Sequence, residues 1–387
     1  MRFDRVDQLR GIAALAVVIC HSSVSAYKTA PNLDGGPWPW LALTLGFGYL
    51  GVPLFFVISG FCIHLPQARA LASGEPGPTP AWCRFFARRF WRLYPPYLAA
   101  MGLAFVLLSL VKALPSVSWV TLAAQALLVH TFHPASFDGV NPPVWSLAVE
   151  AQLYLAYPLV FRLIARRGAL RALAIVLGVT MAYRLGVTVM PLPPAFGGLA
   201  WEFFLARWFE WGLGALIAEW AVGRLALPRV VFPPETAGVA LGLGVLMEWQ
   251  TWRYGLYTLK EPIYGIAFAL LLCVALRRPR VGRASIVGRS LAAVGVYSYS
   301  LYLLHRPIQL AFEPLARNVA AWPLVVAHGI PSSLLIMTAT MPIVLLASWL
   351  FYRYCEAPCV LRAQRVGRDE GPSQQTGKPA SRSVLGS

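Results

Sequence analysis

The sequence predicts an all-α integral membrane protein, a polytopic bundle of about ten transmembrane helices. Of its 387 residues, 58% are hydrophobic and only 13% are charged, and the mean hydropathy is +0.60. Soluble globular domains carry about 25% charged residues. The apolar residues fall in runs near the ~20 residues that a helix needs to cross the hydrocarbon core. This composition excludes the common soluble classes.

Ten apolar segments have, or approach, the length of a membrane span. They cover approximately Leu9–Tyr27, Thr44–Leu65, Tyr97–Ala113, Val144–Ile164, Leu170–Met190, Phe203–Ala221, Thr236–Trp249, Tyr264–Leu276, Leu291–Phe312 and Leu324–Tyr352. The seventh and eighth are short, and the last is long. A further apolar piece, Trp119–Phe132, is too short to span, and we expect a re-entrant or interfacial segment there.

The distribution of basic residues supports this topology. With the N-terminus in the cytoplasm, the inner loops, the tails and the inner ends of spans hold 25 of the 33 basic residues. The outer loops and outer ends of spans hold five, and three fall well within spans. The positive-inside rule therefore predicts ten spans and two cytoplasmic termini. The net charge of +17 reflects this topology, and we expect no nucleic-acid partner. We assign residues 1–362 to the transmembrane domain and 363–387 to a disordered cytoplasmic tail.

The six cysteines are scattered, and we expect free thiols. Only Cys355 and Cys359 have a spacing that suits metal ligands, and no other Cys or His lies near them. We therefore expect no metal site. The N-terminus lacks a cleavable signal, so we expect the first span to be retained.

The first span carries a basic residue and a histidine on one face. Arg10 and His21 are eleven positions apart, which places them within about 20° around the helix and about 16 Å apart along it. Ionisable residues are costly inside a membrane, and a functional role is the usual explanation. A histidine that is merely hydrogen-bonded between helices is the alternative.

Two other spans carry polar stripes. In the fourth, Ser146, Glu150, Tyr154 and Tyr157 share a face, and a carboxylate in hydrocarbon needs a partner or a cavity. In the ninth, Ser298, Tyr302 and His305 lie on one face. Counted from the inner ends of their spans, His21, Glu150 and His305 lie at about 18–21 Å depth. We expect these three to meet in one plane.

The loop before the third span is rich in arginine. Arg88 and Arg92 share a helical face and Arg89 lies beside them. Topology or lipid headgroup contacts explain some of this charge, and a phosphorylated ligand is the functional alternative.

Other polar residues favour structural roles. Ser59 and Gly60 interrupt an apolar run, which is typical of close helix packing. Arg207 and Glu210 are three positions apart and can neutralise one another. The remaining histidines are expected at membrane interfaces; they are His64, His130, His133 and His328.

Seven motifs in order resemble the membrane-bound acyltransferase 3 family, which includes bacterial O-acetyltransferases of surface polysaccharides and acylases of macrolide sugars. They are Arg10-x10-His21, Phe55–Phe61, Arg88-Arg89-x-x-Arg92-x-Tyr94-Pro95, Trp145-Ser146-Leu147-x-Val149-Glu150, Arg207-x-x-Glu210-x-x-x-Gly214, Ser298-Tyr299-x-x-Tyr302-Leu303-x-His305 and Glu356-Ala357-Pro358. The resemblance covers about residues 3–362. It implies a multi-pass protein of the bacterial cytoplasmic membrane.

The resemblance also implies a reaction. An acyl group, expected to be acetyl, would pass from acyl-coenzyme A, a donor substrate, to a hydroxyl of a surface polysaccharide, lipid-linked glycan or glycosylated metabolite. His21 would act as general base, and Glu150 would orient or stabilise its imidazole; an acyl-histidine intermediate is the alternative. The donor's phosphates would contact the arginines. The implied donor-binding residues are Arg10, Arg88, Arg89, Arg92 and Tyr94. The implied tunnel and second-tier residues are Ser59, Ser146, Tyr302, His305, Arg207 and Glu210.

Two other functions fit parts of this pattern. A transporter or glycan flippase also uses a polar cavity at the membrane midplane, although internal repeats are absent and the arginines lie on one side. A non-catalytic acyl-binding subunit would not need both His21 and Glu150. No permanently bound cofactor is expected, and the oligomeric state is left open.

Overall fold

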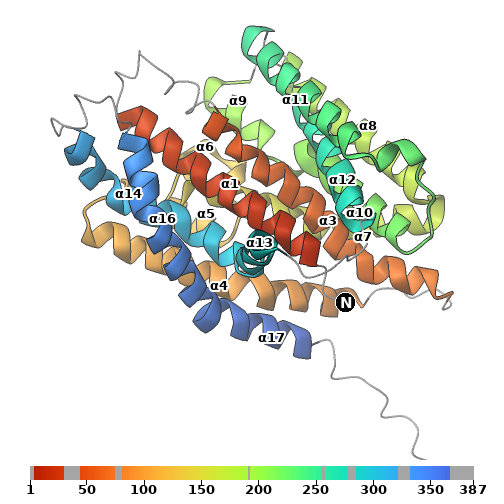
Figure 1. The fold of residues 1–387 in the computed structure, drawn as a ribbon, viewed down its shortest axis with the longest axis horizontal. Coiled ribbons are helices and arrows are strands. Elements are labelled where there is room, and N and C mark those ends of the chain that lie inside the picture. Colours follow the sequence, from red (N-terminus) through yellow and green to blue (C-terminus); the bar gives the residue numbers. More distant parts are fainter. Residues whose placement is uncertain are drawn as a thin grey trace, which may run out of the picture.

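The computed structural model describes residues 4–29, 44–74, 81–190, 192–254, 258–277, 285–320 and 332–366. This part of the chain is helical throughout, without a strand (Figure 1). The α-helices are α1 (Asp4–Thr29), α3 (Gly51–Ala72), α4 (Trp82–Leu110), α5 (Trp119–Ala126), α6 (Pro134–Phe137), α7 (Trp145–Arg167), α8 (Ala169–Val189), α9 (Pro194–Trp201), α10 (Phe204–Ala221), α11 (Pro234–Tyr254), α12 (Lys260–Arg277), α13 (Ile286–Val296), α14 (Ser298–Ala320), α16 (Ser332–Phe351) and α17 (Ala357–Arg365). Short 3-10 turns are η1 (Phe47–Leu50), η2 (His130–Phe132), η3 (Pro142–Val144) and η4 (Arg229–Val231), and η5 (Tyr352–Glu356) is a π-helix.

The predicted all-helical fold is confirmed over the described residues, and its apolar helices are consistent with a membrane protein. Five helical stretches of the described residues are long and apolar enough to cross a membrane. They are Thr44–Ala72, Trp82–Leu110, Pro142–Arg167, Ala169–Val189 and Thr338–Arg365. The count of ten spans and the cytoplasmic location of both termini stay predictions. Residues 324–331 of the tenth predicted span and residues 367–387 of the predicted tail lie outside the described residues.

Several predicted boundaries differ from the structure, and two of the differences affect the site. The third predicted span begins at Tyr97, but α4 starts at Trp82 and passes through Pro95 and Pro96 without a break, so the arginine-rich segment and the span are one helix. The ninth predicted span is interrupted at Tyr297, which separates α13 from α14. A Cβ atom on Gly295 would lie 1.8 Å from the Asp7 carbonyl oxygen. That close contact with α1 fixes α13 just before the interruption.

Glycine brings the central helices into backbone contact. A Cβ atom on Gly60 of α3 would lie 1.9 Å from the Trp211 carbonyl oxygen, and one on Gly214 of α10 would lie 2.0 Å from the Val57 carbonyl oxygen. The sequence predicted that Ser59 and Gly60 allow close helix packing, and this is confirmed for Gly60. In Figure 1, α1 and α3 run through the centre, with α8, α10, α11 and α12 on one side and α4, α14, α16 and α17 on the other.

The segment between α4 and α7 contains only short helices, as its length predicted. Buried polar groups form hydrogen bonds between this segment and α14. The Asn141 amide donates to the Leu303 carbonyl oxygen at 2.8 Å, and the Tyr302 hydroxyl donates to the Pro143 carbonyl oxygen. The chain thus enters α7 beside the middle of α14, which brings the polar stripes of both helices together.

Candidate active site

A cavity of about 150 Å³ lies between the central helices and those on the α4 side. Its walls come from α1, α3, α4, α7, α13, α14 and the π-helix η5. Its lining is mixed, with charged groups on several walls, so the cavity suits a ligand with a charged part.

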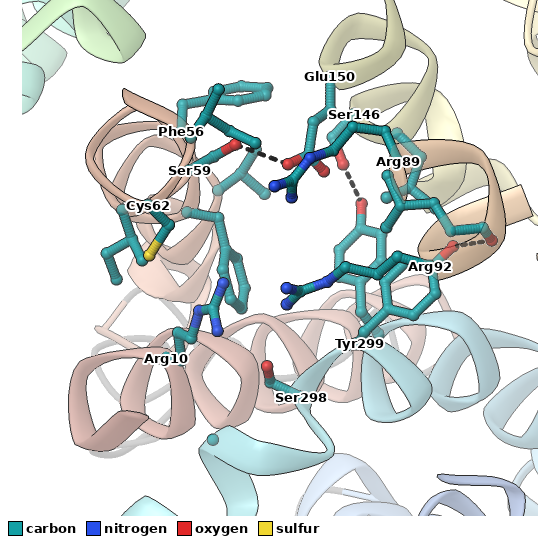
Figure 2. Close-up of a pocket in the computed structure, with 18 of the residues that line it drawn as sticks. Arg10, Phe56, Ser59, Cys62, Arg89, Arg92, Ser146, Glu150, Ser298 and Tyr299 are labelled. Atoms are coloured by element: carbon teal, nitrogen blue, oxygen red, sulfur yellow. Dashed lines mark hydrogen bonds between the residues drawn. The ribbon is translucent and has the colours of Figure 1, made fainter. Parts of the chain in front are cut away.

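Three guanidinium groups line this cavity. Arg10 comes from α1, and Arg89 and Arg92 come from α4 (Figure 2). Arg88 and Tyr94, which the family resemblance assigned to the same site, do not line it. On α4, positions 89, 92 and 93 form one stripe at i, i+3 and i+4. Position 94 points to another face and position 88 lies at the flank of the stripe.

The carboxylate of Glu150 faces the same cavity. It accepts hydrogen bonds from the Ser59 hydroxyl at 2.7 Å and from the Tyr154 hydroxyl (Figure 2). Three residues of the predicted face, Ser146, Glu150 and Tyr154, line the cavity. The fourth, Tyr157, does not line it and contacts His64 instead. The hydrogen bonds of Glu150 do not include His21.

Tyr302 closes the cavity on the side of the histidines. The Ser146 and Tyr302 hydroxyl oxygens lie 2.7 Å apart, and the Tyr302 hydroxyl donates to the Pro143 carbonyl oxygen. The Tyr302 ring centroid is 5.7 Å from that of His305. One side chain therefore stands between the cavity and the histidine ring.

His21 and His305 form a pair. The Nε2 atom of His305 lies 3.3 Å from the Nδ1 atom of His21, and their ring centroids are 5.0 Å apart. The Nδ1 atom of His305 lies 2.7 Å from the Tyr302 carbonyl oxygen, and the Nδ1 atom of His21 lies 2.9 Å from the Val17 carbonyl oxygen. A carbonyl oxygen only accepts, so both Nδ1 atoms carry the proton.

These tautomers determine what each ring can do. In a neutral His305 ring, Nε2 is an acceptor that faces the N–H of His21. In a neutral His21 ring, Nε2 is then the basic nitrogen, and the structure describes no hydrogen bond to it. Of the three residues predicted to meet, His21 and His305 do so, whereas Glu150 is hydrogen-bonded to Ser59 and Tyr154. His305 is only seven residues from the start of α14, because the predicted span is interrupted.

Arg207 and Glu210 lie outside the cavity, in a separate buried ion cluster. Arg207 contacts Glu202 at 3.1 Å, Glu261 at 3.6 Å and Glu210 at 3.9 Å. Glu261 also pairs with Arg184 of α8. This geometry supports mutual neutralisation, the structural interpretation of the pair.

Two histidines expected at interfaces are buried instead. His64 and His130 are fully buried, whereas His133 is exposed and His328 lies outside the described residues. His64 contacts Glu219 at 2.7 Å and the Tyr157 hydroxyl at 3.0 Å. The span boundary explains this error, because α3 continues to Ala72, seven residues beyond the predicted end.

Sequence reasoning did not assign Glu356 to the site. This carboxylate lines the cavity from the π-helix. The signal that could have identified it in the sequence is an acidic residue at the end of a long apolar segment.

The described cysteines are free thiols, as predicted, and Cys62 lines the cavity. The described residues contain no group of three or more side chains suited to hold a metal ion.

A family model described as an acyltransferase domain matches residues 3–353. The chain belongs to this acyltransferase 3 family. It is therefore an enzyme that transfers acyl groups. The predicted resemblance is confirmed over nearly the whole chain.

Curated relatives agree with this assignment. The acyltransferase MdmB of Streptomyces mycarofaciens is 27% identical over 321 residues, which cover 79% of this chain and 78% of MdmB. The peptidoglycan O-acetyltransferase OatA of Listeria monocytogenes is 26% identical over 336 residues, or 80% of this chain and 50% of OatA. The O-acetyltransferase OatA of Staphylococcus aureus is 26% identical over 331 residues, which cover 78% of this chain and 50% of that OatA. The matched part thus spans half of each OatA chain. No solved structure matches the chain.

Proposed function

We propose that this acyltransferase moves a short acyl group, expected to be acetyl, from acyl-coenzyme A to a sugar hydroxyl. The observation that carries the proposal is the cavity with three guanidinium groups, which ends one side chain away from a histidine pair. Guanidinium groups bind phosphate in bidentate fashion. The acceptor class follows the relatives, two of which are named O-acetyltransferases. The protein would act in the cytoplasmic membrane of a bacterium.

In the proposed reaction, the Nε2 atom of His21 takes the proton of the acceptor hydroxyl as its oxygen attacks the thioester carbonyl. The carbon–sulfur bond breaks, and the imidazolium returns the proton to the leaving thiolate, which departs as coenzyme A. General base catalysis of this kind contributes ~10²–10⁴-fold in rate. His305 keeps the basic nitrogen of His21 on the outer side of the ring pair. Attack by His21 itself, with an acyl-histidine intermediate, uses the same nitrogen.

Glu150 has an electrostatic role in this proposal. It is hydrogen-bonded to Ser59 and Tyr154 and does not contact His21. It would therefore stabilise the positive charge that develops on His21 at a distance, across the cavity. The acceptor would be a polysaccharide, a lipid-linked glycan or a glycosylated metabolite.

The test uses purified protein in lipid nanodiscs. Binding of radiolabelled acetyl-coenzyme A is measured first, and transfer to a panel of peptidoglycan fragments, oligosaccharides and macrolide glycosides follows. We expect binding and transfer in the wild type, binding without transfer in His21→Ala, and both in the control His133→Gln, an exposed histidine. Near-normal transfer by His21→Ala or Glu150→Gln contradicts the mechanism. Passage of a glycan across the bilayer without acyl transfer favours a flippase.

A further inference from the structure

The cavity contains a second carboxylate beside the arginines. Glu356 is only 4% exposed and lines the same cavity as Arg92 and Arg10. The mechanism above does not use it. A buried negative charge in a site that we propose binds a polyanion requires an explanation, because it opposes the ligand.

Glu356 is hydrogen-bonded to the first turn of α14. Its carboxylate accepts from the Ser300 backbone N–H at 3.2 Å and from the Ser300 hydroxyl. Because α14 starts directly after the interruption at Tyr297, its first N–H groups lack partners within the helix. A carboxylate at this position satisfies one of them and interacts favourably with the helix dipole. Glu356 thus stabilises the start of the helix that carries Tyr302 and His305.

Other contacts tie the same turn to the arginine helix. The Tyr299 hydroxyl donates to the Leu93 carbonyl oxygen of α4 at 2.8 Å, next to Arg92 (Figure 2). The Arg362 guanidinium of α17 lies 3.8 Å from the ring centroid of Trp91 on α4. The π-helix lies between α16 and α17, and such turns often occur at functional sites. The arginines, the start of α14 and the C-terminal helices therefore form one connected unit around Glu356.

We propose that Glu356 is a positioning and specificity-determining residue of the donor site. Its hydrogen bonds to Ser300 hold the first turn of α14, and its charge offsets those of Arg10 and Arg92 before the donor binds. The same charge repels the donor's phosphates, which keeps the coenzyme product from binding too tightly to leave. The inference rests on the proposed acyl-coenzyme A donor.

The charges in the cavity make this proposal testable. The lining contains three arginines and two carboxylates, Glu150 and Glu356. Glu356→Gln keeps an oxygen that accepts from Ser300 but removes the repulsion of the phosphates. We expect the Kd for coenzyme A to fall about tenfold, as for one charge interaction in a partly buried site. The gain is expected to be smaller for dephospho-coenzyme A, which has one phosphate fewer.

Three variants separate charge from structure. Ser300→Ala removes a hydrogen bond but keeps the charge, so kcat is expected to fall while Kd stays within twofold. Glu356→Met, of similar volume and uncharged, is the second test if the Gln variant misfolds, and it too is expected to bind more tightly. Glu313→Gln makes the same charge change on α14 outside the cavity and is the control, with Kd unchanged.

The outcomes distinguish this inference from the proposed function. If the wild type does not bind coenzyme A in nanodiscs, the proposed donor is wrong. If the wild type binds coenzyme A and folded Glu356→Gln and Glu356→Met bind it equally or more weakly, the inference alone is overturned. An equal gain for coenzyme A and dephospho-coenzyme A would also contradict the proposed repulsion.

Discussion

The Nε2 atom of His305 lies 3.3 Å from the Nδ1 atom of His21, across 284 residues of sequence. Each ring is also held by a backbone carbonyl, His305 by Tyr302 and His21 by Val17. In many His-dependent enzymes a carboxylate fixes the tautomer of the catalytic imidazole. Here a second imidazole occupies that position, and Glu150 is hydrogen-bonded elsewhere. This arrangement changes which residue we expect to support the base.

Replacement of His305 tests that arrangement. His305→Phe preserves a ring of similar volume but removes the nitrogen that faces His21. We expect kcat to fall about 10–10²-fold, because the Nδ1–H of the charged His21 ring loses the acceptor nitrogen of His305 and a hydrogen bond to a charged group contributes ~1.5–3 kcal/mol, while the donor KM stays within twofold. His130→Phe, at another fully buried histidine, is the matched control. Normal kcat in a folded His305→Phe protein would show that His21 does not depend on this neighbour.

The arginines of α4 offer a comparison within one helix. Arg92 lines the cavity and Arg88 does not, yet both were predicted to bind the donor. We expect Arg92→Gln to raise the donor KM about tenfold or more, because a charge-assisted hydrogen bond to phosphate contributes ~1.5–3 kcal/mol. Arg88→Gln is expected to change KM less than twofold. Initial rates at several salt concentrations measure both effects, and equal losses in the two variants would contradict the placement of the donor.

Contact between α3 and α10 depends on glycine. Gly60→Ala would place a methyl group 1.9 Å from the Trp211 carbonyl oxygen, so the helices must separate. We expect a loss of about 2 kcal/mol and a fall in Tm of roughly 5 °C in thermal unfolding of the purified protein. Gly102→Ala on α4 has open space around its Cβ position and is expected to leave Tm unchanged or slightly higher. A Tm loss as large in Gly102→Ala would indicate a general effect of alanine rather than helix contact.

Sequence patterns were most informative where they reflect the free-energy cost of burying an ionisable side chain. Burying Arg10, His21 and Glu150 in an apolar chain requires a polar surrounding, and the structure supplies the cavity and the histidine pair. The face shared by Ser146, Glu150 and Tyr154 followed from helical geometry, which local sequence determines.

Other features depend on contacts between distant segments. The interruption at Tyr297 follows the close approach of Gly295 to Asp7, which no local pattern indicates. The continuity of α4 through Pro95 and Pro96 goes against the local preference of proline. The role of Glu356 depends on a partner 56 residues away. For the same reason, the sequence does not separate the roles of Ser59 and Gly60. Ser59 is hydrogen-bonded to Glu150, whereas Gly60 packs against α10.

The ion cluster around Arg207 gives the remaining prediction. Arg207 is buried and contacts Glu202, Glu210 and Glu261, so Arg207→Gln leaves these carboxylates without a shared cation. Breaking a buried ion pair costs about 3–5 kcal/mol, and we expect a corresponding fall in Tm with an unchanged donor KM in the protein that remains folded. The double variant Arg207→Gln, Glu210→Gln removes one of the stranded charges and is expected to recover part of the loss. If Arg207→Gln instead kept the wild-type Tm and lost acyl transfer, the pair would have a role in the reaction rather than in mutual neutralisation.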